Sequence, residues 1–326
     1  MKIVITGGAG FLVSRLAFAL LKRGTLADRD GRQAPIRELV LLDNVAATAI
    51  DEPRVKTVAG DVSDAPTLRR VIGDDTDAVF HLAAVVSGEA EADFDLGMRV
   101  NLDGTRALLE ACRRLARPSR MVFASSVAVF GVPLPPVVTD ATTPTPRASY
   151  GVQKLMSELL VSDYSRKGFV DGRSVRLPTI VVRPGRPNRA ASSFASGIIR
   201  EPLSGAPSVC PVPKQTLVWM LSPQRAVEAF IHAHELPAQR WQPDRMVNLP
   251  GITLSVDEMV AALARVAGAS VAGRVSYQLD PLIARIVATW PVRFDTARAD
   301  AMGFARDADF DSILRSYIDD QGIRVT

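Results

Sequence analysis

The sequence predicts an α/β fold in which helices cover both faces of a doubly wound parallel sheet. Three observations support this prediction. Short apolar runs alternate with amphipathic stretches through the first half of the chain, a glycine-rich turn follows the first run directly, and polar residues close several of the runs. Apolar runs that do not alternate with polar residues are typical of strands buried on both faces.

The expected strands and helices follow one another in a regular order. The apolar runs, interpreted as strands, are residues 2–6, 39–43, 55–59, 78–84, 121–125 and 174–177. The amphipathic stretches, interpreted as helices, are residues 11–22, 65–72, 100–115 and 150–166. The polar segment 24–33 delays the second strand, so we interpret it as a peripheral surface insertion. This alternation is that of a Rossmann fold.

Composition and charge argue against several classes of protein. The 326 residues are 47% hydrophobic and 23% charged, and the net charge of +4 is too balanced to indicate a nucleic-acid or membrane partner. No apolar stretch approaches the length needed to cross a bilayer, so a cytoplasmic protein is expected. Cys112 and Cys210 lack a neighbouring ligand set, and we expect two reduced thiols and no metal site.

The turn after the first strand has the glycine pattern of a dinucleotide site. It contains Gly7 and Gly10, and helical periodicity begins at Phe11 and Leu12. Glycines allow a tight turn and a close approach of the backbone to a pyrophosphate, whose charge then lies at the helix N-terminus. We therefore expect these four residues to bind the cofactor; an ordinary glycine-rich turn is the alternative.

Two acidic residues follow the next strands. Asp43 ends the second strand, where its carboxylate would accept hydrogen bonds from ribose hydroxyls and repel a 2′-phosphate, which favours NAD over NADP. The alternative for Asp43 is a simple strand-end turn residue. Asp61 ends the third strand, and we expect it and Val62 to lie near the adenine.

The composition of the chain changes beyond Pro184, where loops rich in Pro, Gly, Ser and Arg are expected. We therefore expect a Rossmann domain that binds NAD over residues 1–182, with residues 215–250 returning to it. A smaller C-terminal part, which would bind the substrate, is expected from residues 183–214 and 251–326.

Tyr150 and Lys154 are four residues apart in a predicted helix, so both side chains can reach one small volume. A free phenol has a pKa near 10, so a Tyr that acts as a base at neutral pH needs help from a neighbouring cation. The spacing alone is common. Ser125 and Ser126 make a functional role of this pair more specific, because they end the fifth strand at the sheet edge where open parallel sheets bind ligands.

These motifs together resemble the extended short-chain dehydrogenase/reductase family. The matching residues are Thr6-Gly7-x-x-Gly10, Gly60-Asp61, His81-Leu82-Ala83-Ala84, Asn101-x-x-Gly104-Thr105, Ser125-Ser126, Val129-Phe130-Gly131 and Tyr150-x-x-x-Lys154. The resemblance implies that Ser126 orients the substrate oxygen, Tyr150 is the acid/base, and Lys154 holds the nicotinamide ribose and tunes Tyr150.

The same resemblance implies further contacts. Those to NAD are expected at Leu82, Ala83, Ala84, Asn101 and Pro178, in addition to Tyr150, Lys154 and the residues above. Those to the substrate are expected at Ser87, Ser125, Ser126 and Tyr150. Asn101 would support a bend in its helix, whereas His81 resembles a structural strand residue.

Two departures from the family pattern matter. Val13 stands where the pattern has its third glycine, and its side chain would crowd the packing of helix against strand near the pyrophosphate. We therefore expect weaker NAD binding or a shifted helix. Val127 and Ala128 follow Ser126 where the sugar dehydratases of the family have acidic residues, which argues against a dehydratase.

The segment from Arg183 to Arg200 is rich in arginine and has no acidic residue, which indicates an anionic substrate. The candidates for binding it are Arg183, Arg186 and Arg200; a solvated basic loop is the alternative. Several further stretches are similar to one branch of the family, namely residues 87–95, 183–188, 191–202 and 290–295. By this resemblance, which extends over nearly the whole chain, the expected activity is that of the branch that oxidises D-erythronate, a four-carbon sugar acid, at its 2-hydroxyl with NAD. The expected product is 2-dehydro-D-erythronate.

Two other functions remain open on the sequence. The first is a nucleotide-sugar epimerase, which would keep NAD tightly bound and recycle it in each turnover. The second is a binding protein that senses a dinucleotide without catalysis, although the intact Ser126, Tyr150 and Lys154 argue against it. The resemblance also makes a homodimer possible.

Overall fold

The computed structural model describes residues 1–45, 50–185, 190–242 and 244–324. The chain divides into two units, each built from segments that are distant in sequence. The first unit contains residues 1–129, 146–176 and 227–248, and the second contains residues 130–145, 177–226 and 249–326.

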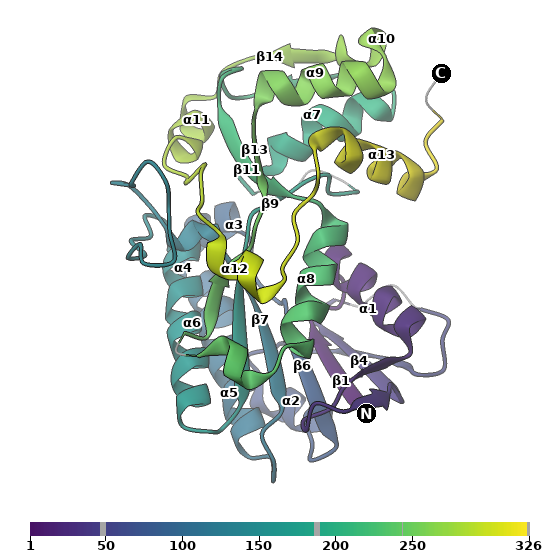
Figure 1. Ribbon diagram of the computed structural model, residues 1–326, viewed down its shortest axis with the longest axis vertical. Coiled ribbons are helices and arrows are strands. Elements are labelled where there is room, and N and C mark those ends of the chain that lie inside the picture. The colour runs from purple at the N-terminus through teal and green to yellow at the C-terminus, as the bar shows by residue number, and fades with distance from the viewer. Residues whose placement is uncertain (46–49, 186–189, 243, 325–326) are drawn as a thin grey trace. The chain divides into compact units, whose positions relative to one another are not determined.

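A seven-stranded sheet of order β12-β8-β7-β6-β1-β4-β5 forms the centre of the first unit (Figure 1). Its strands are β1 (Lys2–Thr6), β4 (Glu38–Asp43), β5 (Val55–Ala59), β6 (Thr76–His81), β7 (Arg120–Ser126), β8 (Asp171–Leu177) and β12 (Met246–Asn248). The neighbouring strands are parallel. From β1 the chain proceeds through β4 to β5, then crosses back to β6 on the other side of β1. The boundary between β1 and β6 is therefore the switch point at which such sheets bind ligands.

Helices cover both faces of this sheet, which confirms the predicted doubly wound fold. The helices of this unit are α1 (Phe11–Arg23), α2 (Ala65–Val71), α3 (Ser87–Ala92), α4 (Phe94–Gly97), α5 (Gly104–Arg113), α6 (Ser149–Arg166) and the C-terminal part of α8 (Pro223–Glu235). Val4 of β1 packs in one cluster with Leu68 of α2, Leu108 of α5 and Val161 of α6. On the other face, the ring of His234 in α8 lies 5.5 Å from that of Phe80 in β6.

The segment 24–33 is not the peripheral insertion that the sequence predicts. It forms most of a hairpin of β2 (Thr25–Ala27) and β3 (Gln33–Pro35), in which Leu26 and Ala27 are buried. His234 Nε2 donates to the Ala27 carbonyl at 2.8 Å, and Arg29 donates to the Thr76 carbonyl at 2.6 Å. The hairpin is therefore an anchored part of the first unit, because buried side chains and hydrogen bonds tie it to α8 and to the start of β6.

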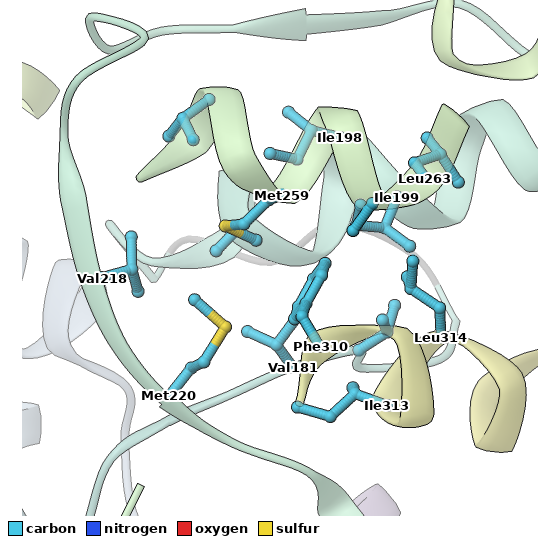
Figure 2. Close-up of a cluster of buried hydrophobic side chains, with 14 of the residues drawn as sticks. Val181, Ile198, Ile199, Val218, Met220, Met259, Leu263, Phe310, Ile313 and Leu314 are labelled. Atoms are coloured by element: carbon cyan, nitrogen blue, oxygen red, sulfur yellow. The ribbon is translucent and has the colours of Figure 1, made fainter. Parts of the chain in front are cut away.

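The second unit has its own small sheets and helices. A three-stranded sheet contains β9 (Thr179–Ile180), β11 (Leu217–Leu221) and β13 (Ile252–Ser255), and β10 (Ser208–Cys210) pairs with β14 (Val275–Tyr277). Its helices are α7 (Ser193–Leu203), α9 (Val256–Ala267), α10 (Ala269–Ala272), α11 (Pro281–Val287), α12 (Ala297–Met302), α13 (Phe310–Gln321) and the first turn of α8. Figure 2 shows its core, in which side chains of α7, α9 and α13 meet those of β11.

The division into units differs from the predicted one in three places. The part of the first unit that precedes the second unit's segment 177–226 ends at residue 176 rather than at residue 182, because β9 pairs with β11 in the second unit. Residues 130–145 also belong to the second unit, where the Val138 N–H donates to the Arg293 carbonyl at 2.9 Å. Of residues 215–250, residues 227–248 belong to the first unit and the others belong to the second. None of the described helices is both long and apolar enough to span a membrane.

Candidate active site

The glycine-rich turn lies at the switch point of the sheet and depends on the absence of a side chain at Gly7. Gly7 has a φ of 86°, and a Cβ there would stand 2.9 Å from the backbone nitrogen of Ala83. The Gly7 and Gly8 N–H groups donate to the Leu42 carbonyl at 2.9 and 3.0 Å. At Gly10, the N-cap of α1, no side chain caps the helix. A tight glycine cradle that leads into an uncapped helix N-terminus fits the pyrophosphate of a dinucleotide.

The predicted ribose-binding carboxylate lies beside this turn. Asp43 Oδ2 accepts the Ala9 N–H at 2.9 Å, and Asp43 Oδ1 accepts the Val45 N–H at 3.2 Å. Phe11 and Leu12 are half-buried in the first turn of α1, as is Asp43 at the end of β4. The four residues predicted from the turn and Asp43 therefore lie in one neighbourhood of the first unit, where they can bind the cofactor.

Asp61 has a partner that sequence reasoning missed. Its Oδ1 accepts both the backbone N–H and the hydroxyl of Ser63 at 2.8 Å, and its Oδ2 pairs with Arg99 Nη1 at 2.9 Å. The neighbouring Val62 is buried, and a Cβ on Gly104 would meet it at 2.7 Å. Gly104 therefore allows the helical segment that carries Arg99 to pack closely on the end of β5.

A buried chain of hydrogen bonds joins the turn to the helix that contains Asn101. The Thr105 hydroxyl donates to the Asn101 carbonyl at 2.7 Å, so it accepts from His81 Nε2 at 2.9 Å. His81 Nδ1 then accepts from the Thr6 hydroxyl at 2.7 Å, and the Ala83 N–H donates to Thr6 Oγ1 at 3.2 Å. Burial lowers the pKa of His81 to about 3, so the ring is neutral. His81 thus fixes the backbone around Leu82, Ala83 and Ala84.

Asn101 lies in a π-helical segment, Met98–Asp103, between α4 and α5. Its side-chain oxygen accepts the Val85 N–H at 2.8 Å, and its amide nitrogen donates to the Val85 carbonyl at 3.1 Å and to Gln153 Oε1 at 2.8 Å. The π-helix is a local widening typical of functional positions. It allows one side chain to hold both the loop after β6 and helix α6.

The predicted proton-transfer pair lies at the start of α6. Lys154 is 2% exposed; its Nζ donates to the Ala124 carbonyl at 2.8 Å and lies 5.6 Å from the centre of the Tyr150 ring. Tyr150 and Ser126 are half-buried. A Cβ at Gly151 would stand 2.1 Å from the Ala128 carbonyl oxygen, so α6 can approach the segment after β7 only because residue 151 is glycine. Ser126 Oγ accepts the Ala128 N–H at 3.1 Å.

Burial lowers the pKa of Lys154 to about 7, and the carboxylate of Glu158 opposes this shift. The ammonium is held over the Phe123 ring, 4.7 Å from its centre. A cation held this close to a phenol favours the phenolate, which gives Tyr150 the means to accept a proton.

Ser125 is placed differently from its predicted role as a substrate contact. It is 1% exposed, and its hydroxyl donates to Glu158 Oε1 at 2.5 Å. Glu158 in turn pairs with Arg176 Nη2 at 2.7 Å. This geometry favours a structural role for Ser125 over a contact with the substrate. Sequence reasoning missed both charged residues, although Glu158 continues the four-residue spacing of Tyr150 and Lys154.

Two of the predicted arginines, Arg183 and Arg200, lie in the second unit, and their side chains make hydrogen bonds or ion pairs there. Arg183 Nε donates to the Ile180 carbonyl at 3.1 Å, and its Nη2 donates to Ser192 Oγ at 2.7 Å. Arg200 is 8% exposed and pairs with Glu201 at 2.6 Å, so its charge is neutralised by the residue that follows it. Arg186 lies outside the described residues.

The remaining predicted residues have simple surroundings. Ser87 is half-buried at the first position of α3, and Pro178 is buried between β8 and β9. Cys112 and Cys210 are buried free thiols, and burial raises the pKa of Cys112 to about 12. Within the described ranges, no group of three His, Cys, Asp or Glu side chains is arranged to hold a metal ion.

Comparisons with known proteins find similar proteins along nearly the whole chain. The model of the NAD dependent epimerase/dehydratase family matches residues 3–239. D-erythronate dehydrogenase from Cupriavidus necator is 57% identical over 99% of both chains, and D-erythronate dehydrogenase from Haemophilus influenzae is 44% identical over 98% of this chain and 99% of its own. The crystal structure of the nucleoside-diphosphate-sugar epimerase from Agrobacterium tumefaciens is 40% identical with a TM-score of 0.94, and covers 100% of this chain and 96% of that chain.

Proposed function

We propose that this chain, which belongs to the NAD dependent epimerase/dehydratase family, is the dehydrogenase that oxidises D-erythronate to 2-dehydro-D-erythronate. The observation that carries the proposal is the 57% identity, over almost the whole of both chains, to a protein named D-erythronate dehydrogenase. The site is consistent with it, because Ser126 ends β7 and Lys154 Nζ donates to the Ala124 carbonyl of the same strand. Tyr150 lies one turn earlier on α6, in the same unit as the glycine cradle.

The residues of the first unit suffice for the proton chemistry of this oxidation. Ser126 donates a hydrogen bond to the reacting oxygen, and Tyr150, as phenolate, accepts the proton of the 2-hydroxyl. Lys154 stabilises the phenolate before this transfer and can donate to the nicotinamide ribose. Bound NAD would supply the two-electron acceptor that this oxidation requires. Asp43, Asp61 and the turn from Gly7 to Leu12 hold the dinucleotide.

An arginine is expected to supply the charge that recognises the acid. A four-carbon substrate offers few atoms for binding, so a charge-assisted contact to its carboxylate must supply much of the affinity and orientation. Of the predicted arginines, we assign this role first to Arg183, since Arg200 is buried against Glu201. Arg186 is the alternative.

A second candidate function, nucleotide-sugar epimerisation, is favoured by one observation. The Agrobacterium tumefaciens protein of 40% identity carries that name and matches the whole chain in structure. An epimerase returns the hydride to its substrate, so it produces no net NADH, whereas a dehydrogenase releases one NADH for each product.

The test is a turnover screen of purified protein with added NAD. The panel contains D-erythronate, L-erythronate, D-threonate and two nucleotide sugars, and both NADH and sugar products are measured. The proposal predicts stoichiometric NADH with D-erythronate and no change in the nucleotide sugars. Interconversion of a nucleotide sugar without net NADH, together with no reaction of any sugar acid, contradicts it.

A further inference from the structure

A buried carboxylate with no assigned role lies one helical turn beyond Lys154. Glu158 is 0% exposed and follows Lys154 by four residues on α6. Its carboxylate accepts the Ser125 hydroxyl at 2.5 Å, Arg176 Nε at 2.9 Å and Arg176 Nη2 at 2.7 Å. Three donors from two strands, β7 and β8, therefore converge on one side chain of α6.

Stability alone does not explain such an arrangement. Removing two charges from water costs several kcal/mol per ion, and well-packed apolar residues often replace a buried ion pair without loss of stability. Glu158 and Arg176 instead fix how α6 meets the carboxyl ends of β7 and β8. That is the part of the sheet that carries Ser126.

We propose that Glu158 is a positioning residue of the catalytic centre, acting through Ser125 and Lys154. The inference rests on the proposed function for the roles of Lys154 and Ser126. Ser125 lies between Ala124, whose carbonyl accepts Lys154 Nζ at 2.8 Å, and Ser126. By holding the Ser125 hydroxyl, Glu158 keeps the acceptor of Lys154 and the hydroxyl that would meet the substrate in fixed positions relative to α6.

The charge of Glu158 also supports the catalytic centre, because it favours the protonated form of Lys154. The titratable side chains that the structure links directly to Lys154 are Tyr150 and Glu158 on α6 and the neutral His81 on β6. The other elements packed against α6 carry charged residues as well, among them Glu91 on α3, Arg99 and Asp103 on the π-helical segment, Arg106 and Glu110 on α5, and Arg120 on β7. Glu91 accepts the Ser149 N–H at the start of α6, and Arg176 faces Glu158. Burial lowers the pKa of Lys154, and Glu158 is the group that raises it. Loss of the Glu158 charge therefore lowers the fraction of Lys154 that is protonated near neutral pH.

This loss has a defined consequence at Tyr150. An ammonium beside a phenol lowers the pKa of the phenol, and a neutral amine does not. When Glu158 is replaced by a neutral residue, the pKa of Tyr150 therefore rises. The acidic limb of the pH profile of kcat, which reports deprotonation of Tyr150, moves to higher pH.

The test is a spectroscopic titration of Tyr150 that requires no substrate. The chain has 4 tyrosines, so the phenolate absorbance of Tyr150 is obtained as the difference between each protein and its Tyr150→Phe counterpart. Glu158→Gln should raise the titration midpoint of Tyr150 by roughly half a pH unit or more. In the active enzyme it should lower kcat at neutral pH, with little change in KM.

A matched control is available at the other end of β8. Asp171 is a mostly buried carboxylate that pairs with Arg173 at 2.6 Å and with Arg245 at 2.7 Å. Asp171→Asn should lower the free energy of unfolding and leave the Tyr150 midpoint unchanged.

If Glu158→Gln fails to fold, the double variant Glu158→Gln/Arg176→Met removes both charges and should still raise the titration midpoint of Tyr150. Ser125→Ala keeps the ion pair and should lower kcat by up to about tenfold through looser geometry.

The outcomes separate this inference from the proposed function. An unchanged Tyr150 midpoint in a folded Glu158 variant overturns the inference, even if the enzyme oxidises D-erythronate. A raised midpoint in a chain that oxidises no sugar acid supports the inference and refutes the proposed substrate. Equal midpoint shifts in Asp171→Asn and Glu158→Gln would assign the effect to general loosening and would also overturn it.

Discussion

The two units differ in how their functional side chains are held. In the first unit, most of the predicted residues lie at or near the ends of strands of one parallel sheet, and contacts with the backbone hold them in place. Gly7 packs against the backbone of Ala83, and Lys154 donates to the Ala124 carbonyl. In the second unit, Arg183 is held by a carbonyl and a hydroxyl, and the charge of Arg200 is paired with Glu201. A motif at a strand end can therefore be recognised from sequence, whereas the availability of a charge depends on partners that the fold selects.

The largest effect is expected in the first unit, at the acid/base. Tyr150→Phe keeps the ring and should keep the fold and NAD binding, but it removes the group that accepts the proton. We expect turnover to fall by roughly a hundredfold to ten-thousandfold, measured as steady-state NADH formation. A variant with more than about half of the wild-type rate would show that the proton leaves by another route.

The next effect tests the second unit and separates Arg183 from Arg200. Arg183→Ala should raise KM for the sugar acid by roughly tenfold, or about 1.4 kcal/mol, and leave NAD affinity unchanged. Lysine at this position should rescue only partly, because a point charge lacks the fork of a guanidinium.

Arg200→Ala is the comparison variant. It leaves Glu201 without its partner, so the free energy of unfolding should fall by about 3 kcal/mol while KM changes little. If the thermal unfolding of Arg200→Ala is unaffected and its KM for the sugar acid rises instead, Arg200 and not Arg183 binds the carboxylate.

A moderate effect is expected at Asp43, where the first unit selects its cofactor. The carboxylate lies beside the turn and would repel a 2′-phosphate. We expect kcat/KM to be at least roughly tenfold higher with NAD than with NADP, and Asp43→Asn should narrow this ratio. Equal efficiency with both cofactors in the wild-type protein contradicts the assignment.

The smallest effect concerns Val13, which the glycine pattern predicts to crowd the pyrophosphate site. The side chain is 2% exposed and lies on the buried face of α1. Val13→Gly should lower the free energy of unfolding by about 2 kcal/mol, from lost burial and helix propensity. We expect the NAD affinity from calorimetry to change by less than about threefold, or about 0.6 kcal/mol. Binding that is tighter by tenfold would show that Val13 does crowd the site.

Much of the first unit could be predicted from sequence. Buried strands reveal themselves as apolar runs, and the carboxyl ends of parallel strands must meet at one edge. Gly7, Asp43 and Ser126 can therefore be assigned to one site from their positions at strand ends alone. The turn chemistry and the Tyr150–Lys154 spacing are local features.

The rest depends on contacts between distant segments. Nothing in the sequence of residues 24–33 reveals that the hairpin packs on α8. The partner of Ser125 lies 33 residues away in Glu158, and the charge that balances Glu158 lies a further 18 residues on, in β8. The pairing of β9 with β11, which moves the domain boundary, is equally non-local. Glu201 is the exception, because it follows Arg200 directly and its pairing is visible in the sequence.

In the proposed reaction, a hydride leaves C2 of D-erythronate and is transferred to NAD. The most direct measurement uses D-erythronate carrying deuterium at C2, with the reduced cofactor analysed by mass spectrometry. We expect NADH that carries one deuterium, formed in equal amount with 2-dehydro-D-erythronate, and the rate of its formation should fall at least roughly a hundredfold in Tyr150→Phe under the same conditions. Unlabelled NADH, or no NADH at all from a folded protein that binds NAD, would contradict it.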